Sequence, residues 1–152
     1  MRLVLFEPDI PQNAGTLMRL AACLGVPVDV IEPCGFVFGS SKHRRAGMDY
    51  LDRLDLIRHD SWSTFHESHV RQGGRLVLLT TKGALPYTDF AFQADDVLMV
   101  GRESAGVPDA VHGAAFSRLF VPMESGMRSL NVAVSAAMVL GEALRQTGGF
   151  PG

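Results

Sequence analysis

The sequence predicts one α/β domain, residues 1–152, with a mostly parallel sheet flanked by helices. Short apolar runs, of the type that parallel sheets bury on both faces, alternate along the chain with segments of helical periodicity. The chain has 152 residues, of which 47% are hydrophobic and 20% charged, as expected for a soluble protein with one well-filled core. Neither an internal repeat nor a low-complexity linker divides it, so we expect a single domain.

Local patterns predict the first three elements. Arg2–Phe6 is mostly apolar and is predicted to be a strand. A helix is predicted from Asn13, a residue suited to the N-cap, up to Gly25, which ends it. The apolar residues of this helix recur at i, i+3, i+4 and i+7, as Leu17, Leu20, Ala21 and Leu24. Val28–Ile31 is the next predicted strand.

The rest of the chain continues the alternation of helices and strands. We predict a short helix within Lys42–Leu51, a strand at Leu54–Arg58, a helix at Ser61–Gln72, strands at Arg75–Thr80, Val97–Val100 and Arg118–Val121, and a final helix at Ser129–Gln146. Ser129 is placed at the N-cap of that final helix.

The final helix has an unusual distribution of polar residues. Asn131, Ser135 and Glu142 form a polar line along it, and the rest of its circumference is apolar. A helix that is apolar almost all round must be covered on more than one side. In so small a chain this indicates a partner subunit. A central helix in one core, with Asn131 as a capping residue, explains the pattern equally well.

Three loops follow predicted strands and are candidates for a ligand site. They are Thr80–Gly83, Gly101–Pro108 and Pro122–Arg128. In open parallel sheets, ligands bind beyond the carboxyl ends of the strands. If the strands are parallel neighbours, the three loops share one edge of the sheet.

Several common sites are not supported by the sequence. A dinucleotide site needs G-x-G-x-x-G after the first strand, and the segment from Pro8 to Gly15 contains prolines instead, which lack the N–H groups that hold a pyrophosphate. His66 and His69 are three residues apart, but no further ligand completes a metal set, so we expect surface histidines and no metal. Cys23 and Cys34 cannot form a disulfide scaffold.

Charge and hydropathy leave the binding partner open. The formal net charge is −2, yet Lys42-His-Arg-Arg45 is a compact basic run. The N-terminal apolar run is too short for a signal peptide, and the longest apolar stretch, Leu130–Leu144, is shorter than the roughly 20 residues of a membrane span. We therefore expect a cytoplasmic protein with no membrane partner.

Three ordered motifs resemble those of the SPOUT RNA methyltransferases. They are Asn13-Ala-Gly15 with Arg19, then Gly101-x-Glu103-x-x-Gly106-x-Pro108, then Arg128-Ser-Leu-Asn131. The likeness covers about Leu3 to Gln146. It is strongest to the small single-domain members that methylate the ribose 2′-hydroxyl of the wobble nucleotide in tRNA-Leu isoacceptors.

The resemblance implies a fold, a cofactor and partners. The family has a deep C-terminal trefoil knot, an exception to the rule that chains avoid knots. Its members are homodimers that methylate RNA with S-adenosylmethionine and release S-adenosylhomocysteine; the expected RNA is tRNA. Carried over by position, the cofactor-binding residues are Leu79, Thr80, Gly101, Glu103, Val121, Met123, Ser129 and Leu130.

The resemblance also implies catalytic and RNA-binding residues. Arg19, Asn131 and Ser129 are expected at the reaction centre, with Arg19 first an organiser of phosphate and oxyanion, because a guanidinium is a poor base. The residues expected to contact RNA phosphates are Lys42, Arg44, Arg45 and Arg128.

This chain departs from the family pattern at two positions. Gly141 stands where relatives often have tyrosine, and Arg102 where they often have proline. Three alternatives remain: a knotted RNA-binding dimer without catalysis, a 2′-O-methyltransferase acting on another tRNA or rRNA nucleotide, and an unrelated Rossmann-like oxidoreductase. The last would bind NADH and not S-adenosylmethionine.

Overall fold

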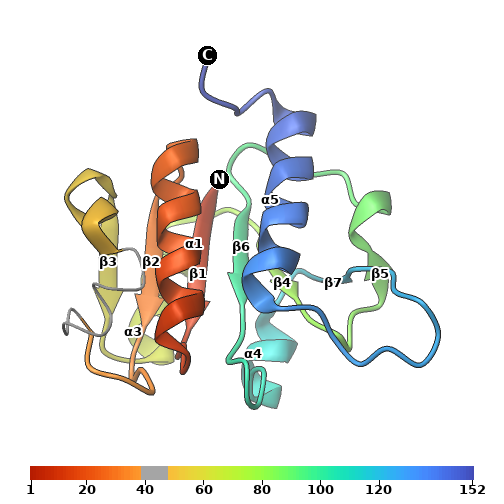
Figure 1. Ribbon diagram of the computed structural model, residues 1–152, viewed down its shortest axis with the longest axis horizontal. Coiled ribbons are helices and arrows are strands. Elements are labelled where there is room, and N and C mark those ends of the chain that lie inside the picture. The colour runs from red at the N-terminus through yellow and green to blue at the C-terminus, as the bar shows by residue number, and fades with distance from the viewer. Residues whose placement is uncertain (39–47) are drawn as a thin grey trace.

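A sheet whose strands all run parallel forms the centre of the protein (Figure 1). The computed structural model describes residues 1–38 and 48–152. Within these residues the sheet has seven strands in the order β3-β2-β1-β6-β4-β7-β5. The strands are β1 (Arg2–Phe6), β2 (Val28–Ile31), β3 (Leu56–His59), β4 (Leu76–Leu79), β5 (Leu85–Pro86), β6 (Val97–Val100) and β7 (Ser117–Phe120). The prediction of an α/β fold with a parallel sheet is confirmed.

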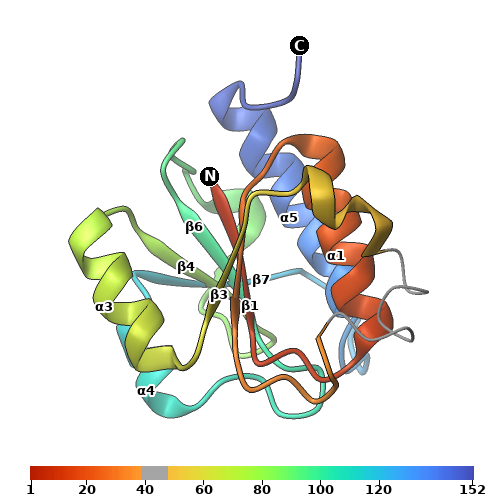
Figure 2. The ribbon, with the colours of Figure 1, turned by 90° about the vertical axis from the view of Figure 1, so that its left-hand side faces the viewer.

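Helices cover both faces of the sheet (Figure 2). On one face lie α1 (Pro11–Leu24) and α5 (Val132–Thr147), which pack side by side, and on the other lie α3 (Trp62–Gln72) and α4 (Asp109–Ala114). Two short 3₁₀ helices lie in the connections between strands: η1 (Met48–Arg53) between β2 and β3, and η2 (Tyr87–Asp89) between β5 and β6. Of the two, η1 packs on α1.

Alternate residues of each strand enter the two cores. In β1, Leu3 and Leu5 belong to the core beneath α1 and α5, whereas Val4 and Phe6 belong to the core beneath α3 and α4. All four side chains are almost fully buried. Successive side chains of a strand point to opposite faces, so a strand buried on both sides must be continuously apolar. This is why these runs could be recognised in the sequence.

The two helix starts predicted from capping residues are wrong. Helix α1 begins at Pro11 with Ile10 as its N-cap, so Asn13 lies within the first turn. Proline is favoured there because its missing N–H would have no partner inside the helix. Helix α5 begins three residues after Ser129, and Asn131 is its N-cap.

Other predicted boundaries are close to those observed. The strand predicted at Leu54–Arg58 is β3, which starts two residues later. No clear sequence pattern marks β5 or α4, which are only 2 and 6 residues long. The short helix predicted within Lys42–Leu51 overlaps η1 at its end. The rest of that range, including Lys42, Arg44 and Arg45, lies outside the described residues.

The chain crosses itself closely between β4 and β5. The amide of Thr80 donates to Leu119 O at 2.9 Å, and that of Ala84 donates to Arg118 O at 3.0 Å. Between them, a Cβ atom on Gly83 would lie 2.5 Å from the carbonyl carbon of Leu119. Only glycine lets the 80–84 segment pass so near the backbone of β7.

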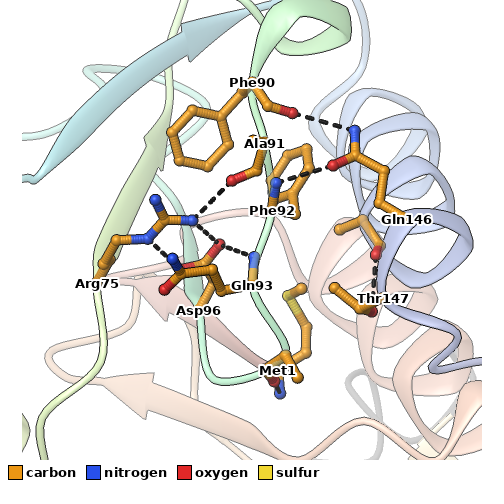
Figure 3. Close-up of polar contacts among 11 residues, drawn as sticks. Met1, Arg75, Phe90, Ala91, Phe92, Gln93, Asp96, Gln146 and Thr147 are labelled. Carbon is orange, nitrogen blue, oxygen red and sulfur yellow. Dashed lines mark hydrogen bonds and ion pairs between the residues drawn. The ribbon is translucent and has the colours of Figure 1, made fainter.

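A buried ion pair ties the amino-terminal edge of the sheet together (Figure 3). The Arg75 guanidinium donates two hydrogen bonds of 2.7 Å to the Asp96 carboxylate, which is fully buried, and a third of 2.9 Å to Ala91 O. Asp96 also accepts from the amide of Gln93 at 2.7 Å. The pairing raises the pKa of Arg75. The three bonds from Arg75 thus hold the segment before β6 against the start of β4, and the bond from Gln93 closes that segment on Asp96.

The same segment is joined to the end of α5. In Figure 3 the Gln146 side chain accepts from the amide of Phe92 at 2.8 Å and donates to Phe90 O at 3.0 Å. The position of α5 over the sheet therefore depends partly on this loop.

Replacing Arg75 by methionine should destabilise the protein strongly. The change leaves the Asp96 carboxylate buried without its cation, which costs about 3–5 kcal/mol. Urea unfolding would measure the loss. The matched control is Arg145→Met, which breaks an exposed ion pair with Glu142 and should therefore cost much less. Equal losses in the two variants would contradict the role of the buried pair.

Gly83→Ala should lower the free energy of unfolding by about 1–3 kcal/mol, because the added methyl group overlaps the backbone of β7. Gly113→Ala is the control, since a Cβ atom there meets nothing within 4 Å and alanine favours the helix. Thermal or urea denaturation of both variants checks the contrast. An unchanged Gly83→Ala protein would show that the crossing tolerates more space than its geometry indicates.

Candidate functional site

A cavity of about 580 Å³ opens at the carboxyl edge of the sheet. Val100 of β6 pairs with Leu79 of β4, and Leu79 pairs with Leu119 of β7, so the three strands end at nearly one level. The loops that follow them converge there, as the sequence predicted, and the segment before α5 closes the cavity. Such a volume is typical of small-molecule sites.

All the residues expected to bind the cofactor line this cavity. They are Leu79, Thr80, Gly101, Glu103, Val121, Met123, Ser129 and Leu130. Arg128 and Asn131, expected to act in RNA binding and catalysis, line it as well. Side chains from four separate segments of the chain are thereby brought to one place.

The lining has the chemistry that S-adenosylmethionine requires. Leu79, Val121 and Leu130 offer apolar walls for a flat base, while Thr80 and Glu103 offer polar groups. Ligand sites combine mostly apolar walls with a few polar groups that fix orientation. The residues present therefore fit this cofactor.

The 101–108 loop folds back tightly on itself. The amide of Arg102 donates to Gly106 O at 3.1 Å, and the amide of Gly106 donates back to Arg102 O at 2.9 Å. A Cβ atom on Gly101 would lie 2.9 Å from the carbonyl carbon of Gly106, and Gly106 has a φ of 62°. Both glycines are needed for this turn.

Glu103 faces a second carboxylate, that of Asp9. The amide of Asp9 donates to Glu103 Oε2 at 3.2 Å, and the amide of Glu103 donates to Asp9 Oδ1 at 3.1 Å. The hydrogen bond from Glu103 lowers the pKa of Asp9 to about 2, whereas burial and the neighbouring Asp9 raise the pKa of Glu103. The pKa values of the two carboxyl groups therefore shift in opposite directions, and Asp9 ionises more readily than Glu103.

Arg102, one of the two departures from the family pattern, has a partner in the segment that follows β1. Its guanidinium lies 3.0 Å from Glu7 Oε2, and its Nε donates to Gly106 O at 3.4 Å. Glu7 adopts a φ of 43°, unusual for a residue with a side chain. A salt bridge to this residue restrains the loop where relatives often have proline.

Asn131 joins the two long helices at the cavity. Its Oδ1 accepts from the amides of Ala133 at 2.8 Å and Val134 at 3.3 Å, which is the capping role left open by the sequence. Its Nδ2 donates to Asn13 Oδ1 at 3.0 Å. Ser129 lies in the extended segment before the helix and is exposed.

Arg19 is the one described residue expected in catalysis that does not line the cavity. It lies on α1 six residues beyond Asn13, about 9 Å along the helix and about 240° around it. The side chain is exposed, with its guanidinium 4.9 Å from the centre of the Tyr50 ring. The sequence correctly placed Arg19 away from the apolar stripe of its helix.

Some lining residues were missed by sequence reasoning. Ile10, Val107, Phe120 and Ser135 line the cavity, and Asn13 lines it rather than capping the helix. Asp9 was also missed, although an acidic residue just beyond β1 lies at the same edge as the three loops. Its position just after the first strand could have identified Asp9 as a residue near the cavity.

His66 and His69, considered in the sequence as metal ligands, both lie on α3. His66 and His69 are half-buried rather than fully on the surface, and stack on Trp62 and Phe65 of the same helix. Burial lowers the pKa of His69. Among the described residues, no three His, Cys, Asp or Glu side chains are grouped to hold a metal ion. The described helices are all too short or too polar to span a membrane.

Comparison with known proteins places the chain among RNA methylases. The SpoU rRNA Methylase family matches residues 1–141. A tRNA (cytidine(34)-2′-O)-methyltransferase of Beijerinckia indica is 60% identical over 146 residues, 96% of this chain and 91% of that protein. A solved structure described as "Structural insights into the 2-OH methylation of C/U34 on tRNA" has a TM-score of 0.89 at 42% identity, covering 95% of this chain and 94% of that one.

A second solved structure has a cofactor bound. It is the SpoU methyltransferase AviRb from Streptomyces viridochromogenes in complex with AdoMet, with a TM-score of 0.86 at 27% identity. The match covers 96% of this chain and 60% of that one. Fold similarity thus extends to a larger protein that binds this cofactor.

Asn131→Ala should destabilise α5, and Ser129→Ala should not. Loss of an N-cap side chain costs about 0.5–2 kcal/mol, whereas Ser129 caps nothing. Urea unfolding of the two single variants decides between the caps. A larger loss for Ser129→Ala would restore the cap predicted from the sequence.

Proposed function

The chain belongs to the SpoU rRNA methylase family, and from this premise we propose that it methylates the ribose 2′-hydroxyl of the wobble nucleotide of tRNA. S-adenosylmethionine would be the methyl donor. One observation above all supports the proposal: the eight residues that the family resemblance assigns to the cofactor line a single cavity at the carboxyl edge of the sheet. They come from three loops that are far apart in the sequence.

S-adenosylmethionine bound in the cavity would supply a methyl group already activated by its sulfonium sulfur. The chain's own residues must then align the nucleophile and help to remove its proton. Alignment of two reactants can supply several kcal/mol of the barrier reduction, and assisted proton transfer about 10²–10⁴-fold in rate. Asn131, fixed by its bonds to α5 and to Asn13, is suited to orient a ribose hydroxyl.

Arg19 is proposed to organise the phosphate and the developing oxyanion of the substrate. A guanidinium offers five N–H donors for this role. The Tyr50 ring restrains this otherwise exposed side chain. Arg128, exposed at the mouth of the cavity, would contact RNA phosphates, together with Lys42, Arg44 and Arg45.

We further propose that the active form is a homodimer. Val134 and Met138 on α5 are 51% and 41% exposed, and Met127 just before it is 67% exposed. Exposed apolar side chains on and beside one helix are typical of a protein interface. The chain's own Arg19 does not line the cavity, and we propose that a second copy supplies it.

The trefoil knot is proposed from the crossing at Gly83. The chain continues from β7, which lies between β4 and β5, back across the sheet to α5. The 80–84 segment closes over β7 at backbone contact distance. Passage of the 122–131 segment through the loop between β4 and β5 would form the knot. An experimental structure in which the 122–131 segment passes outside that loop would overturn this.

Action on tRNA implies that the protein works in the cytoplasm.

The proposed activity should be detected by incubating the protein with radiolabelled S-adenosylmethionine and bulk tRNA. Label should enter the RNA and protect one phosphodiester from alkaline cleavage, because that cleavage needs a free 2′-hydroxyl. Arg19→Ala should lower the rate by about 100-fold or more, as expected when a group that stabilises developing charge is removed. Arg71→Ala, an exposed arginine on the opposite face, should retain the wild-type rate.

The outcomes separate the alternatives. Failure to bind S-adenosylmethionine would refute the methyltransferase, and tRNA binding without labelling would indicate the RNA-binding dimer. Labelling of rRNA alone would change the substrate and keep the chemistry. Sedimentation of the same preparation tests the dimer, since a mass of 16.4 kDa would exclude a second copy.

A further inference from the structure

We propose that Asp9 is a positioning residue that holds the 101–108 loop closed on the cofactor cavity. Nothing in the sequence motifs marks Asp9, and it does not line the cavity itself. It acts through Glu103 and Ser104, which its carboxylate binds. The inference rests on the proposed function, because it assumes that this cavity takes S-adenosylmethionine.

The contacts of Asp9 are concentrated on one short stretch of the loop. Oδ1 accepts from the amide of Glu103 at 3.1 Å, and Oδ2 accepts from the amide of Ser104 at 3.3 Å and from the Ser104 hydroxyl. In return the Asp9 amide donates to Glu103 Oε2 at 3.2 Å. An ionised acceptor with several donors makes strong hydrogen bonds. A single side chain thus fixes two consecutive peptide units of the loop.

The other end of this link is rigid. Gly35 N donates to Pro8 O at 2.9 Å, and a Cβ atom on Gly35 would lie 2.7 Å from Asp9 Cβ. The 33–36 segment therefore presses directly on Asp9. Asp9 also follows β1, a central strand of the sheet. The loop is therefore tied to a residue that packs against the 33–36 segment and lies just after a central strand.

The loop depends on such a tie because its tip is open. Ser104, Ala105 and Gly106 are all exposed, so little apolar burial holds them. Gly101, Glu103 and Val107 of the same loop line the cavity. A shift of the loop would move all of these at once, and misplacement of a positioning group by about 1 Å can cost 10²-fold in rate.

The ionisation of the pair supports the arrangement. The pKa of Asp9 is lowered to about 2 by its hydrogen bonds, so its carboxylate is charged and accepts fully, while the pKa of Glu103 is raised by burial. The nearby charges of Glu7 and Arg102 are paired with each other at 3.0 Å. The Asp9 carboxylate therefore meets the loop as an acceptor for the amides of Glu103 and Ser104.

The test compares Asp9→Asn, Asp9→Ala and Ser104→Ala with a matched control, Asp95→Asn. In Asp9→Asn, the asparagine Oδ1 can still accept from the amide of Glu103. Its Nδ2 group is a donor, so it cannot accept from the Ser104 amide and hydroxyl. Asp95 is an exposed aspartate before β6, at the edge of the sheet away from the cavity. Calorimetric titration with S-adenosylmethionine should show a dissociation constant raised about tenfold or more in both Asp9 variants and unchanged in the control. Ser104→Ala should show a smaller rise.

Trypsin provides a readout that needs no cofactor. It cuts after arginine, and Arg102 lies within the loop. Asp9→Asn should speed cleavage of the Arg102–Glu103 bond about tenfold while leaving cleavage after Arg71 in α3 at the wild-type rate. General destabilisation would speed both cuts equally, so the ratio separates positioning from a merely structural role. In the assay with tRNA, KM for S-adenosylmethionine should rise while KM for tRNA stays constant.

Two results would overturn the inference. One is an Asp9→Asn protein with wild-type cofactor affinity and wild-type cleavage after Arg102. The other is parallel acceleration of both cuts. If the wild-type protein binds no S-adenosylmethionine, the proposed function fails, and the cleavage ratio still decides whether Asp9 holds the loop.

Discussion

The parallel, in-register pairing of the central strands is the constraint on which the rest of the structure depends. Because Leu79 aligns with both Val100 and Leu119, β4, β6 and β7 end together, and their loops must share the space beyond. The same pairing buries both faces of each strand, which requires helices on both sides. The register of the strands therefore brings the cavity residues together, although they are far apart in the sequence.

Polar links between loops give this edge its shape, because loops have little apolar surface to bury. Arg102 pairs with Glu7, Asp9 binds Glu103 and Ser104, and Asn131 bonds to Asn13. Each link joins the segment after β1 to a loop from the other half of the sheet. The segment from Glu7 to Asn13 thus organises the two later motifs.

At the opposite edge of the sheet, an ion pair and two side-chain hydrogen bonds join three segments of the chain. The Arg75–Asp96 pair and the Gln146 bonds fasten the start of β4, the segment before β6 and the end of α5 to one another. Helix α5 is thereby held at its C-terminal end by this cluster and at its N-terminal end by Asn131. A helix fixed at both ends can present Val134 and Met138 to a partner while its other side covers the sheet.

The sequence by itself determined the fold class, the order of most elements and the three loops of the cavity, because buried parallel strands and helices impose periodicities that local residues must satisfy. Through motifs it also led to eight of the residues that line the cavity. Tertiary structure alone decided that Asn131 and not Ser129 caps α5, that Gly83 crosses β7, that Asp9 meets Glu103, and that Arg19 lies outside its own cavity. Asp9 and Glu103, for example, are 94 residues apart in the sequence, and no local periodicity encodes such a contact.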